Sequence, residues 1–401
     1  MTHLAKPSVW PLAVVSAATL LLAACGGGGS DAASGTLRLA LTDAPACGYD
    51  HVYVTVDSVK VHQSASAGEN DPGWYPITLP SLPKRIDLLE LRNGLLEELG
   101  QTALPAGRYT QLRLVLSPNS ASLPYANAVT PTGGAQAALT TPSAQQSGLK
   151  LNVDIEIEPG KLADFVLDFD ACKSVVSAGN SGKFNLKPVI SVLPRFIDGM
   201  AVDGYVANSS PYSSVSLQLN GVVVRSTVPD PARQGYFVLP YLPISSANYD
   251  LVIADPGRGT RVVSAVPVTP LAITHVNSAN QAIQLADSNA QGLVASATAG
   301  NATAGNAIAD ATISVHQSLG TDREIELASR TVDSVNGSSS FTLATDPVQV
   351  ATYSPTLAPL SWLPYNASAA QFSVRSNVPG TPIQSQPVDL RAGSARVDFS
   401  Y

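Results

Sequence analysis

Serine, histidine and glycine residues do not fall into the spacings that common catalytic motifs require. No Gly-x-Ser-x-Gly elbow occurs, and Gly179-Asn180-Ser181-Gly182-Lys183 lacks the full spacing of a phosphate loop. The histidines beyond the N-terminal segment are His51, His62, His275 and His316, without a His-Glu-x-x-His arrangement. We expect His51 at the start of a strand, and His62 and His316 at the ends of exposed strands. The sequence therefore predicts no catalytic residue, no cofactor and no enzyme activity.

Cys25 is the residue with the clearest chemistry. His3 and Lys6 precede an apolar stretch from Val9 to Leu22, which is too short to span a bilayer and is typical of a signal peptide. The stretch ends in Leu22-Ala23-Ala24-Cys25, which resembles the lipobox of bacterial lipoproteins. The resemblance implies cleavage of residues 1–24 and a diacylglyceryl group on the Cys25 thiol. An ordinary secretory signal with an incidental cysteine is the alternative.

The residues after Cys25 bear on where the protein would reside. Residues 25–34 are rich in glycine and serine, as expected of a flexible tether. In the lipoproteins that the lipobox resembles, a residue other than Asp after the cysteine permits transfer to the outer membrane, and Gly26 meets that condition. We therefore expect an outer-membrane lipoprotein that faces the periplasm or the cell surface, with the lipid bilayer as its partner through the acyl anchor.

Cys47 and Cys172 are the two cysteines left once Cys25 is acylated. Export places them in an oxidising compartment, where pairing is the economical outcome. A bridge across this long loop would contribute roughly 4–5 kcal/mol if unstrained. Two buried free thiols, or a metal site with His51 as the neighbouring ligand, are the alternatives.

Four aspartates flank the two cysteines and would be drawn together by such a bridge: Asp43, Asp50, Asp168 and Asp170. Converging carboxylates can bind calcium, which takes six to eight oxygen ligands. The simpler interpretation is that Asp43 and Asp50 cap turns, while Asp168 and Asp170 face water. The four are weak calcium candidates, and no other metal site is predicted.

Other acidic and aromatic residues also have two interpretations. Asp154, Glu156 and Glu158 share one face of a predicted strand, either as a carbohydrate or calcium surface or, more simply, as a solvated face. The aromatic residues Trp74, Tyr75 and Trp362 would form a sugar platform or, more simply, fill the core near proline turns.

Strand patterns dominate the elements that must position these residues. Residues 149–157 alternate strictly, with apolar side chains at odd numbers, and residues 51–62 and 108–116 follow similar patterns. Residues 86–99 carry leucines at mixed spacing and are expected to form short helices around Gly94. With 30 Gly and 30 Pro interrupting any long helix, the fold class is all-β.

Residues 35–196 carry a recognisable set of phrases in order. They are Leu41-Thr42-Asp43-Ala44-Pro45, Val52-Tyr53-Val54-Thr55-Val56, Gly73-Trp74, Ile86-Asp87-Leu88-Leu89, Leu104-Pro105-Ala106-Gly107-Arg108-Tyr109, Gly148-Leu149-Lys150-Leu151, Leu167-Asp168-Phe169-Asp170 and Leu186-Lys187-Pro188-Val189-Ile190. Together they resemble the domain-of-unknown-function 4382 family of bacterial lipoproteins. The resemblance implies a β-sandwich-like extracytoplasmic domain and implies no reaction.

Beyond Arg195 one strand pattern occurs twice, in residues 198–286 and 290–401. A glycine-led strand, an alternating strand, an x-Phe-x-Leu strand, a Leu-Pro corner and an aromatic-led strand follow one another in both segments. This pattern predicts two tandem antiparallel β-sandwich modules with Greek-key connections. They resemble the transthyretin-like or carboxypeptidase-regulatory type of immunoglobulin-like module.

Composition excludes one class of partner and leaves two functions open. A net charge of −7 argues against nucleic acid, which requires a basic face. The favoured function is a non-enzymatic envelope lipoprotein whose modules bind or space a glycan, peptidoglycan or a protein partner. The alternative is an envelope glycan hydrolase that uses paired carboxylates of the first domain.

Overall fold

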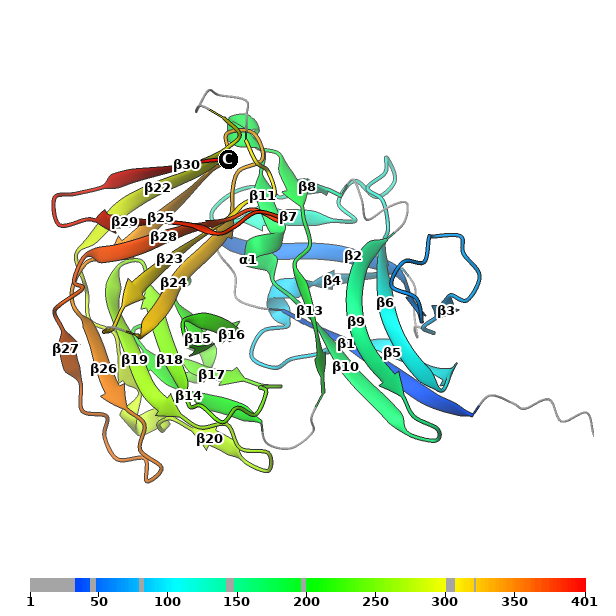
Figure 1. Cartoon of the computed structure of the whole chain (residues 1–401), viewed down its shortest axis with the longest axis horizontal. Helices are drawn as coiled ribbons and strands as arrows, with labels where there is room; N and C mark the ends of the chain where they lie inside the picture. Colours follow the sequence, from blue (N-terminus) through cyan, green and yellow to red (C-terminus); the bar gives the residue numbers. More distant parts are fainter. Residues whose placement is uncertain are drawn as a thin grey trace, which may run out of the picture.

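The computed structural model describes residues 33–43, 48–78, 83–141, 148–195, 200–300, 307–320 and 322–401. Strands dominate these ranges, as predicted, and form three modules: the first module (residues 34–194), the second (201–284) and the third (290–400) (Figure 1). The helical elements described are α1 (Ala171–Ser174) and the 3-10 turns η1 (Leu88–Glu90), η2 (Gly179–Ser181), η3 (Pro231–Arg233) and η4 (Ala279–Gln281). The predicted all-β class is confirmed.

Two sheets build the first module. The smaller has the order β13-β10-β1-β5 and consists of β13 (Ile190–Pro194), β10 (Leu162–Phe169), β1 (Ser34–Asp43) and β5 (Glu97–Pro105). The larger contains β2 (Tyr49–His62), β3 (Tyr75–Pro76), β4 (Lys84–Asp87), β6 (Gly107–Leu116), β7 (Ala128–Pro131), β8 (Ala137–Thr140), β9 (Leu149–Ile157), β11 (Val175–Ser177) and β12 (Phe184–Leu186). β1 and β10 pair in parallel, so the module is not purely antiparallel.

Alternation of side chains explains how these sheets share a core. In β1, Leu37, Leu39 and Leu41 are fully buried, and in β9 Ile155 and Ile157 are buried while Asp154 and Glu156 are exposed. Because successive strand residues point to opposite faces, one face of each sheet enters the core and the other meets solvent or another module. The exposed acidic face expected on residues 149–157 is therefore present.

The expected helices around Gly94 reduce to the single 3-10 turn η1. Asp87 caps this turn by accepting a hydrogen bond from the backbone N–H of Leu89. Asn93 and Gly94 then have φ angles of 57° and 76°, which end the helical path. The chain then enters β5 at Glu97, where pairing with β1 satisfies the backbone and Leu99 is fully buried.

The second and third modules have the same topology. In the second, one sheet joins β14 (Ala201–Ala207), β17 (Tyr236–Leu239), β20 (Ile273–His275) and β21 (Ile283–Gln284), and the other joins β15 (Ser214–Leu219), β16 (Val222–Thr227), β18 (Tyr249–Asp255) and β19 (Arg258–Val266). In the third, the corresponding sheets are β22 (Ala290–Thr298), β25 (Ser338–Ala344) and β30 (Ala395–Ser400), and β23 (Thr312–Ser318), β24 (Glu324–Thr331), β28 (Gln371–Asn377) and β29 (Gln384–Asp389). Each module pairs its first strand antiparallel with one neighbour and parallel with its last, so the predicted tandem repeat is visible in the strand order.

Two strands of the third module leave it and extend a sheet of the second. β26 (Val348–Thr352) pairs in parallel with β19, and β27 (Leu363–Tyr365) pairs with β26. The three strands lie side by side in Figure 1. The strands cover what would otherwise be an open sheet edge, which proteins generally protect. The sequence pattern predicted separate modules divided at residues 286–290, and it did not indicate that β26 and β27 of the third module join a sheet of the second.

Candidate functional site

A cavity of about 390 Å³ lies where the three modules meet, and we call it the junction cavity. The first module contributes Asp170 and Lys173 from the start of α1. The second contributes the outer face of its β15–β16–β18–β19 sheet, and the third contributes β24 and β25. Domain interfaces are common places for ligand sites, so this cavity is the candidate functional site.

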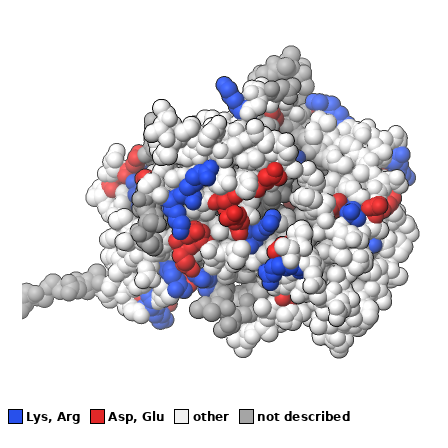
Figure 2. Space-filling view, turned by 180° about the vertical axis from the view of Figure 1, so that it is seen from behind, with Lys and Arg blue, Asp and Glu red and all other residues white. Residues whose placement is uncertain are grey.

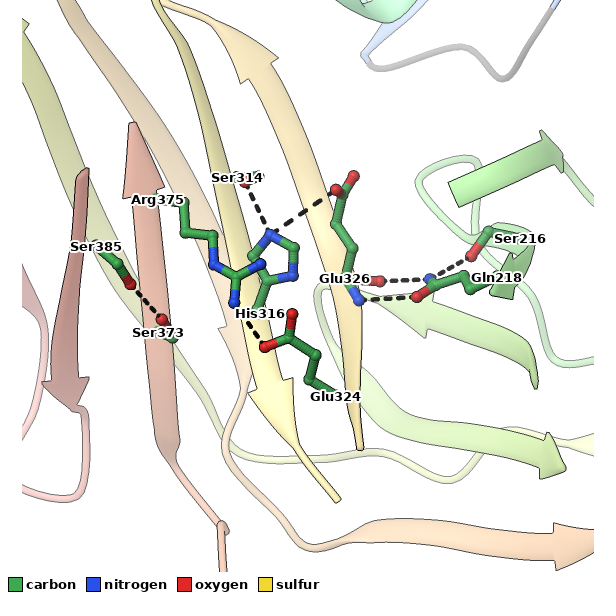
Figure 3. Close-up of polar contacts among 9 residues, drawn as sticks. All are labelled: Ser216, Gln218, Ser314, His316, Glu324, Glu326, Ser373, Arg375 and Ser385. Atoms are coloured by element: carbon green, nitrogen blue, oxygen red, sulfur yellow. Dashed lines mark hydrogen bonds and ion pairs between the residues drawn. The ribbon is translucent and has the colours of Figure 1, made fainter. Parts of the chain in front are cut away.

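The alternation of β15 supplies the second module's wall. Val215 and Leu217 enter the module core, while Ser214, Ser216 and Gln218 point outward, toward the third module. Gln218 is 1% exposed, and its side-chain amide forms two hydrogen bonds with the backbone of Glu326 on β24. These bonds measure 2.7 and 2.8 Å and replace the strand partner that the edge strand β24 lacks (Figure 3).

A buried ion pair joins the first and second modules beside the cavity. Arg225 on β16 donates to the Asp168 carboxylate on β10, and its Nε donates to the backbone oxygen of Pro240 at 3.2 Å. Side-chain exposure is 5% for Arg225 and 14% for Asp168. Burial raises the pKa of Asp168 in spite of the arginine. Asp168 was expected to face water, but here it faces the second module.

α1 presents a second charged pair to the cavity. Asp170 caps the helix through the backbone N–H of Lys173, and the Lys173 ammonium lies 3.0 Å from the same carboxylate. Burial works to lower the pKa of Lys173, but the carboxylates of Asp170 and Glu326 outweigh it, so the pKa is raised. Lys173 therefore stays charged inside the junction.

His316, Ser314 and Glu326 gather on the outer face of the third module's sheet (Figure 3). His316 is 4% exposed, which corrects the expectation that it ends an exposed strand: it sits within β23 opposite Glu326 on β24. Ser314 Oγ lies 2.9 Å from His316 Nε2, and a Glu326 carboxylate oxygen lies 3.9 Å from that same nitrogen. A catalytic triad needs the serine and the acid on opposite ring nitrogens, so this group lacks triad geometry.

The surroundings of His316 and Glu326 shift the pKa of each group in the direction that favours its neutral form. Burial lowers the pKa of His316 to about 4, with the positive charge of Arg375 acting in the same direction. Burial raises the pKa of Glu326 to about 7, while Lys173 opposes the shift and Asp170 adds to it. Arg375 itself is held by Glu324 at 2.7 Å.

These shifts predict opposite pH dependences for the two groups. The folded state holds a proton on Glu326 that the unfolded chain releases, so this contribution to stability is present below about pH 4.5 and lost as pH rises to about 7. For His316 the contribution is present above about pH 6.5 and lost as pH falls toward 4. As pH rises from 4.5 to 8, the free energy of unfolding of Glu326→Gln should therefore increase relative to that of the wild type by on the order of 3 kcal/mol.

Urea unfolding across this pH range measures the effect. The exposed carboxyl of Glu156 on β9 provides the control, and Glu156→Gln should follow the wild-type pH profile. A Glu326→Gln profile parallel to that of the wild type would contradict the role given to burial.

Three of the four calcium candidates lie near one another, because the pairing of β1 with β10 places Asp43 opposite Phe169, between Asp168 and Asp170, whereas Asp50 lies on β2. Asp43 accepts a hydrogen bond from the Ala171 N–H at 3.1 Å, and Asp50 accepts one from the Gly133 N–H at 3.4 Å. Asp168 and Asp170 are engaged by Arg225 and Lys173. Among the residues that the structure describes, no group of three or more His, Cys, Asp or Glu side chains could hold a metal ion.

The cysteine predictions fall partly outside the described residues. Cys172 is disulfide-bonded. Cys25 and Cys47 lie outside the described ranges, so the Cys47–Cys172 pairing and the Cys25 anchor stay predictions. Within those ranges, no helix has the length and apolarity of a membrane span.

The acidic and aromatic candidates occupy separate places. Asp154 pairs with Arg108 at 2.7 Å on the exposed face of β9. Trp74 lies beneath Lys60 and Arg113 in the first module, and Tyr75 packs edge-on against Tyr109. Trp362 instead packs on the second module's core, and no ring contact joins it to Trp74 or Tyr75 in the described ranges. The structure does not assemble them into one sugar platform.

Arg225, Gln218 and Glu326 are the site residues that the sequence analysis missed. None of them belongs to a motif, because each acts on a different module from its own. One signal was available: Arg225 is a lone charge in the apolar strand Val222–Thr227, and Gln218 alternates with core residues.

Comparisons with known proteins give one family and several distant structures. Residues 34–188 match the model of a family described as a domain of unknown function, DUF4382, and no curated protein matches the chain. The major pilin SpaA of Corynebacterium diphtheriae is 9% identical, with 90% of this chain and 99% of that chain covered and a TM-score of 0.18. Two B repeat units of the collagen-binding protein of Staphylococcus aureus are 11% identical, with 92% and 99% covered and a TM-score of 0.17.

TM-scores this low give no basis for assigning fold or function, so the strand topology above carries the description of the modules. The family match confirms the resemblance seen in residues 35–196. The chain therefore contains a DUF4382 domain at residues 34–188, followed by further β-sandwich modules.

Proposed function

We propose that this protein is a non-enzymatic envelope lipoprotein, anchored through Cys25 to the outer membrane, whose β-modules bind or space a glycan, peptidoglycan or protein partner. The second and third modules are proposed to be of the transthyretin-like or carboxypeptidase-regulatory type. The acyl anchor holds the chain to the bilayer, and the tether between Cys25 and the start of β1 at Ser34 separates the folded modules from the membrane.

The observation that carries the proposal is the mutual contact of the three modules around one cavity. Asp168 and Arg225 join the first to the second, and Arg323 joins the third to the second through two hydrogen bonds to Asp250, at 3.0 and 2.7 Å. Asp333 accepts hydrogen bonds from Ser177 and Gly179, which joins the third to the first. A rigid body with a recess suits binding or spacing better than a flexible string of modules would.

The distribution of charge on the surface argues against a polyanionic partner such as nucleic acid. Figure 2 shows Lys and Arg side chains lying beside Asp and Glu side chains on one face, between wide uncharged areas. Such alternation differs from the basic stripe that nucleic-acid binding requires.

Incubation of the purified chain with peptidoglycan sacculi tests the proposal against the glycan hydrolase. The hydrolase has one observation in its favour, because Asp170 and Glu326 both line the cavity. However, Asp170 is engaged with Lys173. We expect no release of soluble fragments or new reducing ends. Their appearance, and their loss in Glu326→Gln, would establish the hydrolase instead.

The anchor is tested by Cys25→Ser. The thiol is the acceptor of the diacylglyceryl group, so the variant should lose palmitate labelling and leave the membrane fraction. Fractionation of cells grown with labelled palmitate measures both, and Cys47→Ser serves as the matched cysteine control that should still label. A Cys25→Ser protein that labels and pellets with membranes would show the lipobox interpretation to be wrong.

A further inference from the structure

We propose that the junction cavity binds a saccharide unit, with Tyr212 stacking on the sugar ring and Glu326 accepting hydrogen bonds from its hydroxyl groups. This inference rests on the proposed function and names the ligand class and the site.

The size and place of the cavity suit a small polar ligand. Its volume of about 390 Å³ falls in the range typical of small-molecule sites. All three modules contribute to its walls, so a ligand there would contact each of them. In the described parts of the second and third modules, apolar side chains fill the space between the two sheets, whereas the cavity walls combine hydroxyl and apolar side chains.

The walls carry many hydroxyl groups from two modules. Ser214, Ser216 and Ser226 line the cavity from the second module, and Ser329, Ser340 and Thr342 line it from the third. Hydroxyl groups both donate and accept, which matches the hydroxyl groups of a sugar. Apolar side chains such as Val223 and Leu327 lie between them and can contact the C–H face of a sugar ring.

Glu326 is the acceptor that the protein leaves available. Among the described residues, its carboxylate accepts no hydrogen bond, and a carboxylate oxygen lies 3.9 Å from Nε2 of the neutral His316 ring. The other carboxylates that line the cavity are occupied: Asp255 accepts from Ser210 and Gly257, and Asp170 holds Lys173. The Glu326 side chain is 18% exposed. A largely desolvated carboxyl group without a donor favours a ligand that brings one, and adjacent sugar hydroxyls can supply two.

Tyr212 supplies an aromatic surface at the cavity's opening. It lines the cavity and is 49% exposed, so its ring is open to solvent. Hydrogen bonds hold its loop in place: Ser210 Oγ accepts from the Tyr212 N–H at 3.1 Å and donates to Asp255 at 2.7 Å. A tyrosine presented in this way has a polar tip and an apolar face that a sugar ring can stack on.

Titration calorimetry of the purified full chain tests the inference with three probes: N-acetylglucosamine, N,N′-diacetylchitobiose and maltose. We expect at least one of them to bind, and Tyr212→Ala to weaken that binding about tenfold. Tyr125→Ala is the matched control, because Tyr125 is 44% exposed and does not line the cavity. Glu326→Gln provides a second cavity variant and should also weaken binding.

Pelleting with sacculi, measured in parallel, shows whether the cavity binds a polymeric glycan or a free saccharide. Its outcomes also differ from those that test the proposed function. Pelleting of the wild type that is lost in Tyr212→Ala supports the cavity as a site for polymeric glycan. Binding of the soluble probes without pelleting supports a free saccharide. Absence of binding to all three probes and to sacculi, or binding that Tyr212→Ala leaves unchanged, overturns the inference. The proposed lipoprotein function would be contradicted by other results: palmitate labelling of the Cys25→Ser variant, or release of soluble fragments from sacculi.

Discussion

Arg225→Met should lower the free energy of unfolding by about 3–5 kcal/mol at pH 7, because it leaves the Asp168 carboxylate in the module junction without its cation. Burial already raises the pKa of Asp168 with Arg225 in place. Without the guanidinium, the folded state would have to hold either an unpaired charge or a proton taken from neutral solution. Urea unfolding followed by tryptophan fluorescence measures the loss.

The pH dependence of that loss follows from the direction of the Asp168 shift. A raised pKa in the folded state means that stability is greatest below the unfolded pKa and falls as pH rises. The penalty of Arg225→Met should therefore be smaller at pH 4 than at pH 7, because protonation removes the unpaired charge. The double variant Asp168→Asn with Arg225→Met should regain much of the stability at pH 7.

Arg108→Met is the matched control for the buried pair. Arg108 on β6 and Asp154 on β9 also form a hydrogen-bonded ion pair, but their side chains are 63% and 69% exposed. Exposed pairs contribute about 0–1 kcal/mol, so this variant should unfold almost as the wild type does. Equal losses in the two arginine variants would refute the argument from burial.

Local patterns in the sequence were sufficient to predict the strands and the repeat. Strict alternation over residues 149–157 predicted β9, because a strand with one buried face needs that period. The x-Phe-x-Leu segments correctly identified β17 and β25, which pair with the first strands of their modules. The position of each strand and the repeat depend on contacts within one module. The pattern of apolar residues along a single strand is enough to indicate them.

The local sequence patterns that predict strands could not predict the contacts between modules. β26 has the composition of an ordinary strand, and nothing in Val348–Thr352 says that its partner is β19 rather than a strand of its own module. His316 and Glu326 are both polar, which normally indicates an exposed face. His316 is buried and Glu326 is half-buried, because other parts of the protein cover the outer face of the third module's β23–β24 sheet, with Gln218 of the second module bonded to the backbone of Glu326. Periodicity cannot distinguish a face covered by protein from one covered by water. The junction cavity was missed for this reason.

Reduction of the Cys172 disulfide should lower the melting temperature by about 10 °C. With Cys47 as the predicted partner, the bond would close a long loop of the first module, and such bonds contribute about 2–5 kcal/mol. The bond constrains α1, whose Asp170 and Lys173 line the junction cavity and whose Ala171 N–H is held by Asp43. Loss of the constraint should therefore loosen the junction as well as the first module. Scanning calorimetry with and without reductant measures the shift.

The Cys47→Ser, Cys172→Ser double variant serves as the control for reduction. It should melt near the reduced wild type and show no further change when reductant is added, because both cysteines of the predicted bridge are gone. Non-reducing peptide mapping identifies the partner directly, and we expect a linked pair of peptides containing Cys47 and Cys172. Free alkylation of Cys47 in oxidised protein would exclude that pairing. A double variant that melts with the oxidised wild type would show that the bond does not stabilise the fold.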